Sequence, residues 1–185
     1  MGGDSSLAVA PEMAARQHVC QSPDLFRQGM RRLAGACTII TSVAPGKART
    51  DWAGMTATAV ASVTADPARL LVCINRSTWA HNIISQSGAV GINVLGDDAL
   101  GLAKLFATGV PAAEKFAQGD WMTSSSGAPL LSSALVSFDC VVAERVAAST
   151  HDIFICDVLD VFLGEPGGDP LIYFDGAFLP ERRAH

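Results

Sequence analysis

Residues 54–78 read GMTATAVASVTADPARLLVCINRST, and this stretch decides the expected fold. Read as one strand, its first half places successive side chains on opposite faces. One face carries the hydroxyl groups of Thr56, Thr58, Ser62 and Thr64. The other face carries the methyl groups of Ala57, Ala59 and Ala61. A row of hydroxyls beside backbone left bare by alanine can hydrogen-bond the edge of a flat polar ligand. The alternative is a solvated strand rich in threonine and alanine.

The second half of the stretch is an apolar strand, Leu70 to Asn75, that ends in Asn75-Arg76-Ser77-Thr78. Ser77 or Thr78 can cap a short helix from Trp79 to Gln86, which Gly88 ends. A guanidinium at such a strand-to-helix junction can grip a phosphate with help from the backbone N–H groups of the helix. The alternative is a surface arginine in an ordinary ion pair.

The rest of the chain is mostly strand. Ser22-Pro23-Asp24 predicts a helix start, with Phe26, Met30 and Leu33 on one face. Asp97-Asp98 predicts the cap of another short helix, and residues 109–129 read as irregular. Two long strands, Leu135 to Ala147 and Ile153 to Leu163, follow, and the second is apolar on both faces. Without βαβ alternation, this order favours a mainly β (α+β) fold: an antiparallel barrel with short peripheral helices.

Composition limits the kinds of protein this chain can be. Its 185 residues suit one domain over residues 21–180, with disordered tails at 1–20 and 181–185. A hydrophobic fraction of 49% with only 17% charged residues predicts burial beyond a monomer core, hence a homo-oligomer. The net charge of -5 and the absence of a basic stripe argue against nucleic acid or membrane partners.

Cysteine usage indicates a reducing compartment. The five cysteines form no CxxC pair, and four lie in apolar strand-like runs: Cys37, Cys73, Cys140 and Cys156. Such residues are typical of reduced, buried thiols, and Cys20 is the fifth. The N-terminal residues lack the pattern of a signal peptide, and no apolar run is long enough for a membrane span. These observations predict a cytoplasmic protein.

Several catalytic motifs are missing. There is no GxGxxG after a strand, no P-loop and no GxSxG elbow. The histidines are too far apart for helical metal-ligand spacing, so no metal site is expected. A nucleotide cofactor must therefore bind outside the Rossmann mode. His151 precedes a buried strand, where it is either a polar turn residue or a group that orients substrate and shares protons.

Taken together, these segments resemble the flavin reductase family, the small reductase components of two-component aromatic monooxygenases. The likeness covers residues 24–178 and rests on the following runs, in order: GMTATAVASVTADPARLLVCINRSTWAHNII, AVGINVL, EKF, GAPLL, THDIFICDVLDV and PLIYFDGAF. The resemblance implies an FMN-binding split β-barrel, a homodimer with flavin at its interface, and reduction of FMN or FAD by NADH or NADPH.

The resemblance also implies roles for particular residues. The flavin ring would contact Thr56, Ala57, Thr58, Ala59, Ser62 and Val63. The phosphate side would be served by Asn75, Arg76 and Ser77, with Asn82, Lys115 and Phe116 as further cofactor contacts. The family places a histidine near the nicotinamide, matching His151, but Ser149-Thr150 replaces the usual Gly-Asp before it. Asp175 also stands where a basic residue is common, so the preference between NADH and NADPH stays open.

Three functions are compatible with this reading. The first is an NAD(P)H:flavin oxidoreductase that supplies diffusible reduced flavin to a partner monooxygenase. The second is a flavoenzyme of the same fold that reduces a corrinoid cobalt centre or a ferric chelate. The third is a non-enzymatic flavin- or haem-binding split barrel. A pyridoxamine-phosphate oxidase is disfavoured, because the chain lacks that family's basic phosphate pocket.

Overall fold

The computed structural model describes residues 22–46 and 51–179. The predicted tails, 1–20 and 181–185, and Cys20 lie outside the described residues. The helices are α1 (Pro23–Arg31), α2 (Trp79–Ser87), the 3-10 turn η3 (Asp97–Ala99), α3 (Leu100–Phe106) and α4 (Ala112–Phe116). The strands are β1 (Gly35–Ala36), β2 (Thr38–Val43), β3 (Trp52–Ala57), β4 (Val60–Ala65), β5 (Ala68–Asn75), β6 (Ala89–Val94), β7 (Trp121–Thr123), β8 (Pro129–Leu131), β9 (Val136–Ala148), β10 (His151–Leu163), β11 (Ile172–Phe174) and β12 (Ala177–Phe178).

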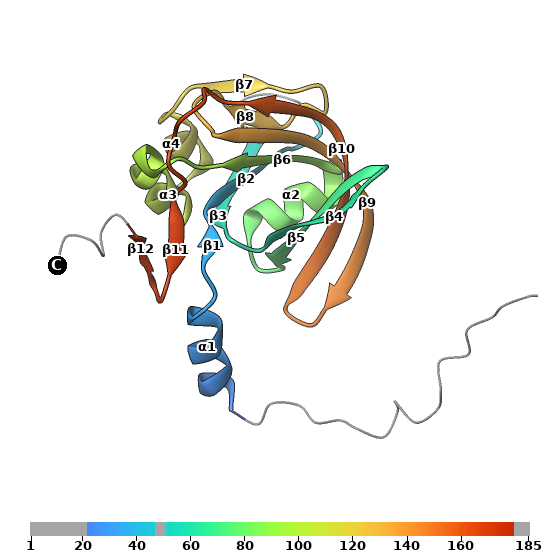
Figure 1. The fold of residues 1–185 in the computed structure, drawn as a ribbon. Helices are drawn as coiled ribbons and strands as arrows, with labels where there is room; N and C mark the ends of the chain where they lie inside the picture. Colours follow the sequence, from blue (N-terminus) through green and yellow to red (C-terminus); the bar gives the residue numbers. More distant parts are fainter. Residues whose placement is uncertain (1–21, 47–50, 180–185) are drawn as a thin grey trace, which may run out of the picture.

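Seven of the strands form one antiparallel sheet in the order β3-β2-β6-β9-β10-β5-β4. The sheet curls into a split barrel, with short helices around it, as the sequence predicted (Figure 1). A three-stranded sheet, β1-β11-β12, and the hairpin β7-β8 lie beside the barrel. Because β3 and β4 are the two edges of the main sheet, neighbouring segments of the sequence end up on opposite edges.

This arrangement overturns the prediction of one continuous hydroxyl strand. β3 ends at Ala57 and β4 begins at Val60, so the hydroxyl row is interrupted at Thr58 and Ala59. The interruption has a topological cause: β3 pairs with β2 at one edge, whereas β4 pairs with β5 at the other. The chain must leave the first ladder before it can join the second. The alternation of side chains in β3 therefore does not continue into β4, and Thr56 and Thr64 do not share one face of one strand.

The predicted helix starts are partly confirmed. Ser22 caps α1 by accepting a hydrogen bond from the Leu25 N–H at 3.2 Å, and Thr78 caps α2 by accepting one from the His81 N–H at 3.2 Å. The short helix predicted after Asp97-Asp98 is present as α3, but these two residues do not cap it, because they belong to the turn η3 and Ala99 is the N-cap of α3. The segment read as irregular, residues 109–129, contains α4 and the strand β7 and includes the first residue of β8.

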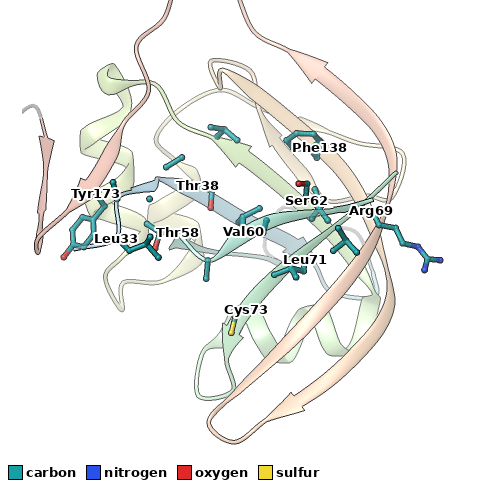
Figure 2. A pocket seen from close by; sticks show the side chains of 18 of the residues that line it. Leu33, Thr38, Thr58, Val60, Ser62, Arg69, Leu71, Cys73, Phe138 and Tyr173 are labelled. Carbon is teal, nitrogen blue, oxygen red and sulfur yellow. The ribbon is translucent and has the colours of Figure 1, made fainter. Parts of the chain in front are cut away.

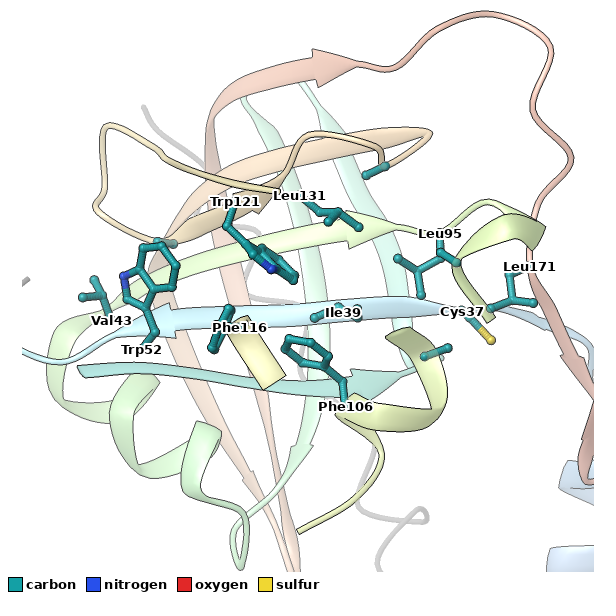
Figure 3. Close-up of a cluster of buried hydrophobic side chains, with 14 of the residues drawn as sticks. Cys37, Ile39, Val43, Trp52, Leu95, Phe106, Phe116, Trp121, Leu131 and Leu171 are labelled. Carbon is teal, nitrogen blue, oxygen red and sulfur yellow. The ribbon is translucent and has the colours of Figure 1, made fainter. Parts of the chain in front are cut away.

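The larger core cluster lies where α3 and α4 pack on β3 and the β7-β8 hairpin (Figure 3). Four aromatic rings interlock there, with centroids 4.9–5.4 Å apart: Trp52, Phe106, Phe116 and Trp121. Gly54 is required at this point, because a Cβ on it would meet the Phe106 ring at 2.6 Å. A second cluster fills the barrel itself, around Val72, Ile92 and Phe154.

Helix α1 is amphipathic but buries none of its residues. The side chains of Phe26, Met30 and Leu33, which the sequence grouped on one face, are 59%, 49% and 66% exposed. The described helices include none with the length and hydropathy that crossing a membrane requires.

The four described cysteines are free thiols, as the sequence predicted. Cys37, Cys140 and Cys156 are buried, and Cys73 is half-buried. Burial raises the pKa of Cys37 to about 11 and that of Cys156 to about 12. The buried thiols therefore stay protonated and unreactive at neutral pH.

Candidate functional site

A groove of about 1350 Å³ opens between α1, the β4-β5 edge of the sheet and the three-stranded sheet. Figure 2 shows side chains that line it, including Ser62 and Leu71 from β4 and β5 and Tyr173 from β11. Four of the predicted flavin contacts line it: Thr58, Ala59, Ser62 and Val63. Apolar side chains from several elements complete the wall, including Leu33, Leu71 and Phe138. A large, mainly apolar groove with a few polar groups has the character of a small-molecule or cofactor site.

The groove is lined by hydroxyl groups and by charged side chains, the latter from Arg27, Arg31, Arg69 and Asp175. Thr38, Thr58, Ser62 and Thr64 all line it. The Thr38 hydroxyl donates to the Ala57 carbonyl at 2.8 Å, which fixes the end of β3 beside the groove. Gly35 leaves room for Thr58, because a Cβ at residue 35 would lie 3.0 Å from the Thr58 Cβ. These residues fit a flat ring system that carries polar atoms along one edge.

Thr56 and Ala57 belong to β3 and do not line the groove. The Thr56 hydroxyl donates to the Ala103 carbonyl of α3 at 2.6 Å, so it fastens a helix to the sheet. Thr56 therefore faces α3, whereas four of the predicted ring contacts lie together at the groove: Thr58, Ala59, Ser62 and Val63.

The predicted phosphate turn lies beyond the groove, at the end of β5. Cys73 lines the groove, and Arg76 follows it by three residues, about 10 Å further along the chain at the usual rise of a strand. The Asn75 side-chain oxygen accepts hydrogen bonds from the N–H and the hydroxyl of Ser77, both at 2.9 Å. This turn leads directly into the N-terminus of α2.

Arg76 also contacts a buried carboxylate that sequence reasoning missed. Asp152 is fully buried and accepts hydrogen bonds from Arg76, His81 and Arg145. Burial raises the pKa of Asp152, but these three hydrogen-bond donors and the positive charge of Arg145 outweigh it, so the pKa lies below its usual range. The signal was present in the sequence, because Asp152 shares strand parity with Phe154 and Cys156 on a buried face. An acid in such a position requires a charged partner.

His151 lies on the opposite face of β10 from Asp152. Its backbone pairs with Asn75 of β5, so it stands beside the predicted phosphate turn. Its Nδ1 lies 2.9 Å from the Thr150 hydroxyl. Ser149, which replaces the family's glycine, has φ of 54°, a left-handed conformation that glycine adopts with less strain. His151 does not line the groove.

The remaining predicted contacts are placed elsewhere. Lys115 is buried, and its Nζ donates to the carbonyls of Phe106 and Gly54 at 3.2 and 3.3 Å. Desolvation lowers the pKa of Lys115. Phe116 belongs to the aromatic core. Asn82 is exposed on α2, where its side-chain oxygen accepts a hydrogen bond from Gln86. Residues 22–46 and 51–179 contain no cluster of His, Cys, Asp and Glu that could hold a metal.

Comparison with known proteins agrees with this architecture. Residues 30–181 match the family described as Flavin reductase like domain. The FMN reductase (NADH) RutF of Stutzerimonas stutzeri (strain A1501) is 44% identical over 149 residues, which cover 80% of this chain and 83% of the relative.

Two solved structures share the fold. Flavin reductase PheA2 has a TM-score of 0.74 and 31% identity, over 85% of this chain and 96% of that one. BorF, the flavin reductase component of a bacterial two-component tryptophan halogenase, has a TM-score of 0.75 and 28% identity, over 85% of this chain and 96% of that one. The match covers most of the described chain, and this protein therefore belongs to the flavin reductase like family.

Proposed function

We propose that this protein is an NADH-dependent flavin reductase that reduces FMN and releases it to a partner monooxygenase. The observation that carries the proposal is the groove beside β4, which presents Thr58, Ser62 and bare alanine backbone to a flat ligand. The relative from Stutzerimonas stutzeri is named as an NADH-dependent FMN reductase, and BorF serves a two-component halogenase. Both descriptions support the same reaction here.

The chain contributes binding and orientation to this reaction. A bound flavin supplies the chemistry, because its ring accepts a hydride from the nicotinamide. Hydroxyls of Thr58 and Ser62 and nearby backbone N–H groups stabilise the negative charge of the reduced ring. The apolar wall, including Leu71 and Val63, would shield a bound flavin ring from water. Such a site needs no strong acid or nucleophile.

His151 and Arg76 take separate roles in this proposal. Arg76 contacts the flavin phosphate at the turn before α2, and His151 orients the nicotinamide. Positioning by a residue such as His151 contributes about ten- to a hundredfold to the rate. A general acid or base contributes more. His151→Ala should therefore spare flavin affinity and slow reduction of the flavin-loaded protein by NADH in stopped-flow measurements. Wild-type reduction rates with a lowered Tm would mean that His151 only supports the turn.

The proposal includes a homodimer whose interface covers α1 and β4. Phe26 and Met30 of α1, and Leu33 just after it, form an exposed apolar surface of the kind that marks an interaction site. A second copy of the chain would bury these side chains and close the groove. Analytical ultracentrifugation should give twice the 19.2 kDa chain mass, and Phe26→Asp should lower it to that of one chain. A monomeric wild-type protein that binds FMN tightly would contradict this part.

Steady-state NADH oxidation with added FMN tests the proposed activity. We expect FMN-dependent turnover, and a slower reaction with NADPH, in the cytoplasmic setting that the free thiols favour. Turnover that requires a ferric chelate or a cobalt corrinoid would support the second function considered above. Flavin binding without any NADH oxidation would support a non-enzymatic binding protein.

A further inference from the structure

Two guanidinium groups are held on one buried carboxylate at the end of the β5-β10 ladder. Arg76 approaches Oδ1 of Asp152 with its Nε at 2.7 Å and its Nη2 at 2.6 Å. Arg145 approaches Oδ2 with its Nε and Nη2, both at 2.5 Å. The Nε2 of His81 donates to the same Oδ2 at 2.8 Å. The three donors come from the β5-α2 turn, β9 and α2, so the cluster joins three elements.

The cluster holds more donors and more positive charge than Asp152 requires. A carboxylate offers about four lone-pair sites, and one bidentate arginine with His81 would already occupy most of them. Both arginines are always protonated, so two positive charges face one negative charge and leave a surplus of one. The side chains of Arg76 and Arg145 are 41% and 45% exposed, so the surplus charge faces solvent.

Each arginine also keeps one nitrogen available. Both guanidinium groups turn the edge formed by Nε and Nη2 toward Asp152, and within the described part of the chain neither Nη1 makes a hydrogen bond. Arg76 begins the turn that leads into the nine-residue helix α2, whose N-terminal N–H groups attract anions. The two guanidinium groups thus lie together around Asp152 at the same end of the sheet, partly exposed to solvent, and that of Arg145 is also 5.8 Å from the centroid of the Phe154 ring.

We propose that Arg145 is a second phosphate contact beside Arg76, and that Asp152 is the positioning residue that presents both guanidinium groups. The ligand is a phosphate group of a bound nucleotide, and this inference rests on the proposed flavin reductase function. The phosphate belongs either to the flavin mononucleotide or to the nicotinamide dinucleotide. The alternative is that the two arginines only neutralise Asp152 and bind no ligand.

Arg145→Gln tests the second contact, with Lys104→Gln on the exposed side of α3 as a control that removes one positive charge elsewhere. We expect Arg145→Gln to raise the Kd for FMN about tenfold, as for the loss of one charge-assisted hydrogen bond. The Kd for riboflavin, which lacks the phosphate, should not change. Lys104→Gln should leave both values unchanged. Equal losses for FMN and riboflavin would overturn the proposal.

The source of the phosphate is decided by the KM for NADH, measured with riboflavin as the flavin. A raised KM in Arg145→Gln, with FMN affinity intact, would assign the phosphate to the nicotinamide dinucleotide. If neither FMN affinity nor this KM changes, while the wild-type protein still reduces FMN, the inference fails and the proposed function stands. A wild-type protein that neither binds flavin nor oxidises NADH would instead remove the proposed function itself.

Asp152→Asn separates positioning from simple charge. The substitution adds one net positive charge to the cluster, so long-range attraction alone predicts tighter FMN binding. Loss of positioning predicts weaker FMN binding with riboflavin affinity unchanged, and this is the result we expect. Tighter binding would overturn the positioning role. If Asp152→Asn does not fold, Arg145→Lys decides, because lysine keeps the charge but lacks the forked side chain. Full retention of FMN affinity by Arg145→Lys would overturn the proposal.

Discussion

The two edges of the main sheet carry similar residues in opposite surroundings. β3 reads WAGMTA and β4 reads VASVTA, and both are made largely of small and hydroxyl side chains. β3 begins with two buried residues and continues half-buried, whereas five of the six residues of β4 are exposed. Helices α2, α3 and α4 pack against β3. β4 instead forms one wall of the groove.

The difference shows how one composition can serve two purposes. At β3, small residues let helices approach, as the close packing of Gly54 against Phe106 demonstrates. At β4, small residues leave backbone accessible to a ligand. Exposed edge strands usually carry charge or proline as protection against association, and Val60–Ala65 carries neither. We infer that β3, the edge covered by helices, provides stability and that β4, the bare edge, provides binding.

The strongest test of this division is Phe116→Ala on the covered edge. Phe116 is 5% exposed among three other aromatic rings, so its truncation should lower the free energy of unfolding by about 3–5 kcal/mol. Urea unfolding of the flavin-free protein measures the loss. Leu163→Ala, at a position that is 82% exposed, is the control and should change stability by less than about 0.5 kcal/mol. Unchanged stability with weakened flavin binding would instead assign Phe116 to the flavin site.

A matched pair of threonines gives a smaller and sharper comparison. Thr56→Val removes the hydrogen bond to the Ala103 carbonyl and should cost about 0.5–1.5 kcal/mol of unfolding free energy without changing flavin affinity. Thr58 lines the groove, and among the described residues its hydroxyl has no hydrogen-bond partner. The Thr58→Val variant should therefore be as stable as the wild type and should bind both FMN and riboflavin more weakly. The reverse pattern would mean that the two edges have been assigned the wrong way round.

The smallest expected effect is a pH dependence at the covered edge. Desolvation lowers the pKa of Lys115 from 10.5, so between its folded and unfolded values the unfolded chain binds more protons. Stability should then rise with pH through that window. The raised pKa values of Cys37 and Cys156 lower stability as the pH rises above 9. The contribution of Lys115 must therefore be measured by comparing the wild type with a variant that lacks the amine. The unfolding free energy of the wild type minus that of Lys115→Met should therefore rise as pH approaches 10.5. A pH-independent difference would show that Lys115 is not desolvated.

Much of this architecture could be predicted from the sequence, because local signals and the family resemblance pointed to the same fold. The caps at Ser22 and Thr78 and the strand β10 follow from local chemistry, and the structure confirms them. The crossing at Thr58 could not be predicted, since it depends on which strands pair at a distance. Lys115 and Phe116 matched a family motif, yet the motif did not reveal that they pack under β3.

The candidate site was predictable only in part for a similar reason. Residues 58–63 share the groove because they are adjacent in the chain. The cluster around Asp152 joins β5, α2, β9 and β10, and no local pattern specifies which cations meet a buried acid. Asp152 falls on the buried face of β10, which indicates that it has a charged partner, but the pattern does not identify that partner as Arg145.

The pairing of β5 with β10 also has a consequence for the order in which the protein assembles during synthesis. Arg76 and Asp152 meet across 76 residues of sequence, and Tyr173 and Asp175 complete the groove from still later in the chain. Domains made on the ribosome fold from the N-terminus as residues emerge, and distant strand pairings form slowly. β4 can pair with β5 early, but β10, the other partner of β5, and the groove wall around Tyr173 form only when nearly the whole chain has been made. The groove beside β4 is therefore incomplete on a partly synthesised chain that lacks these last residues.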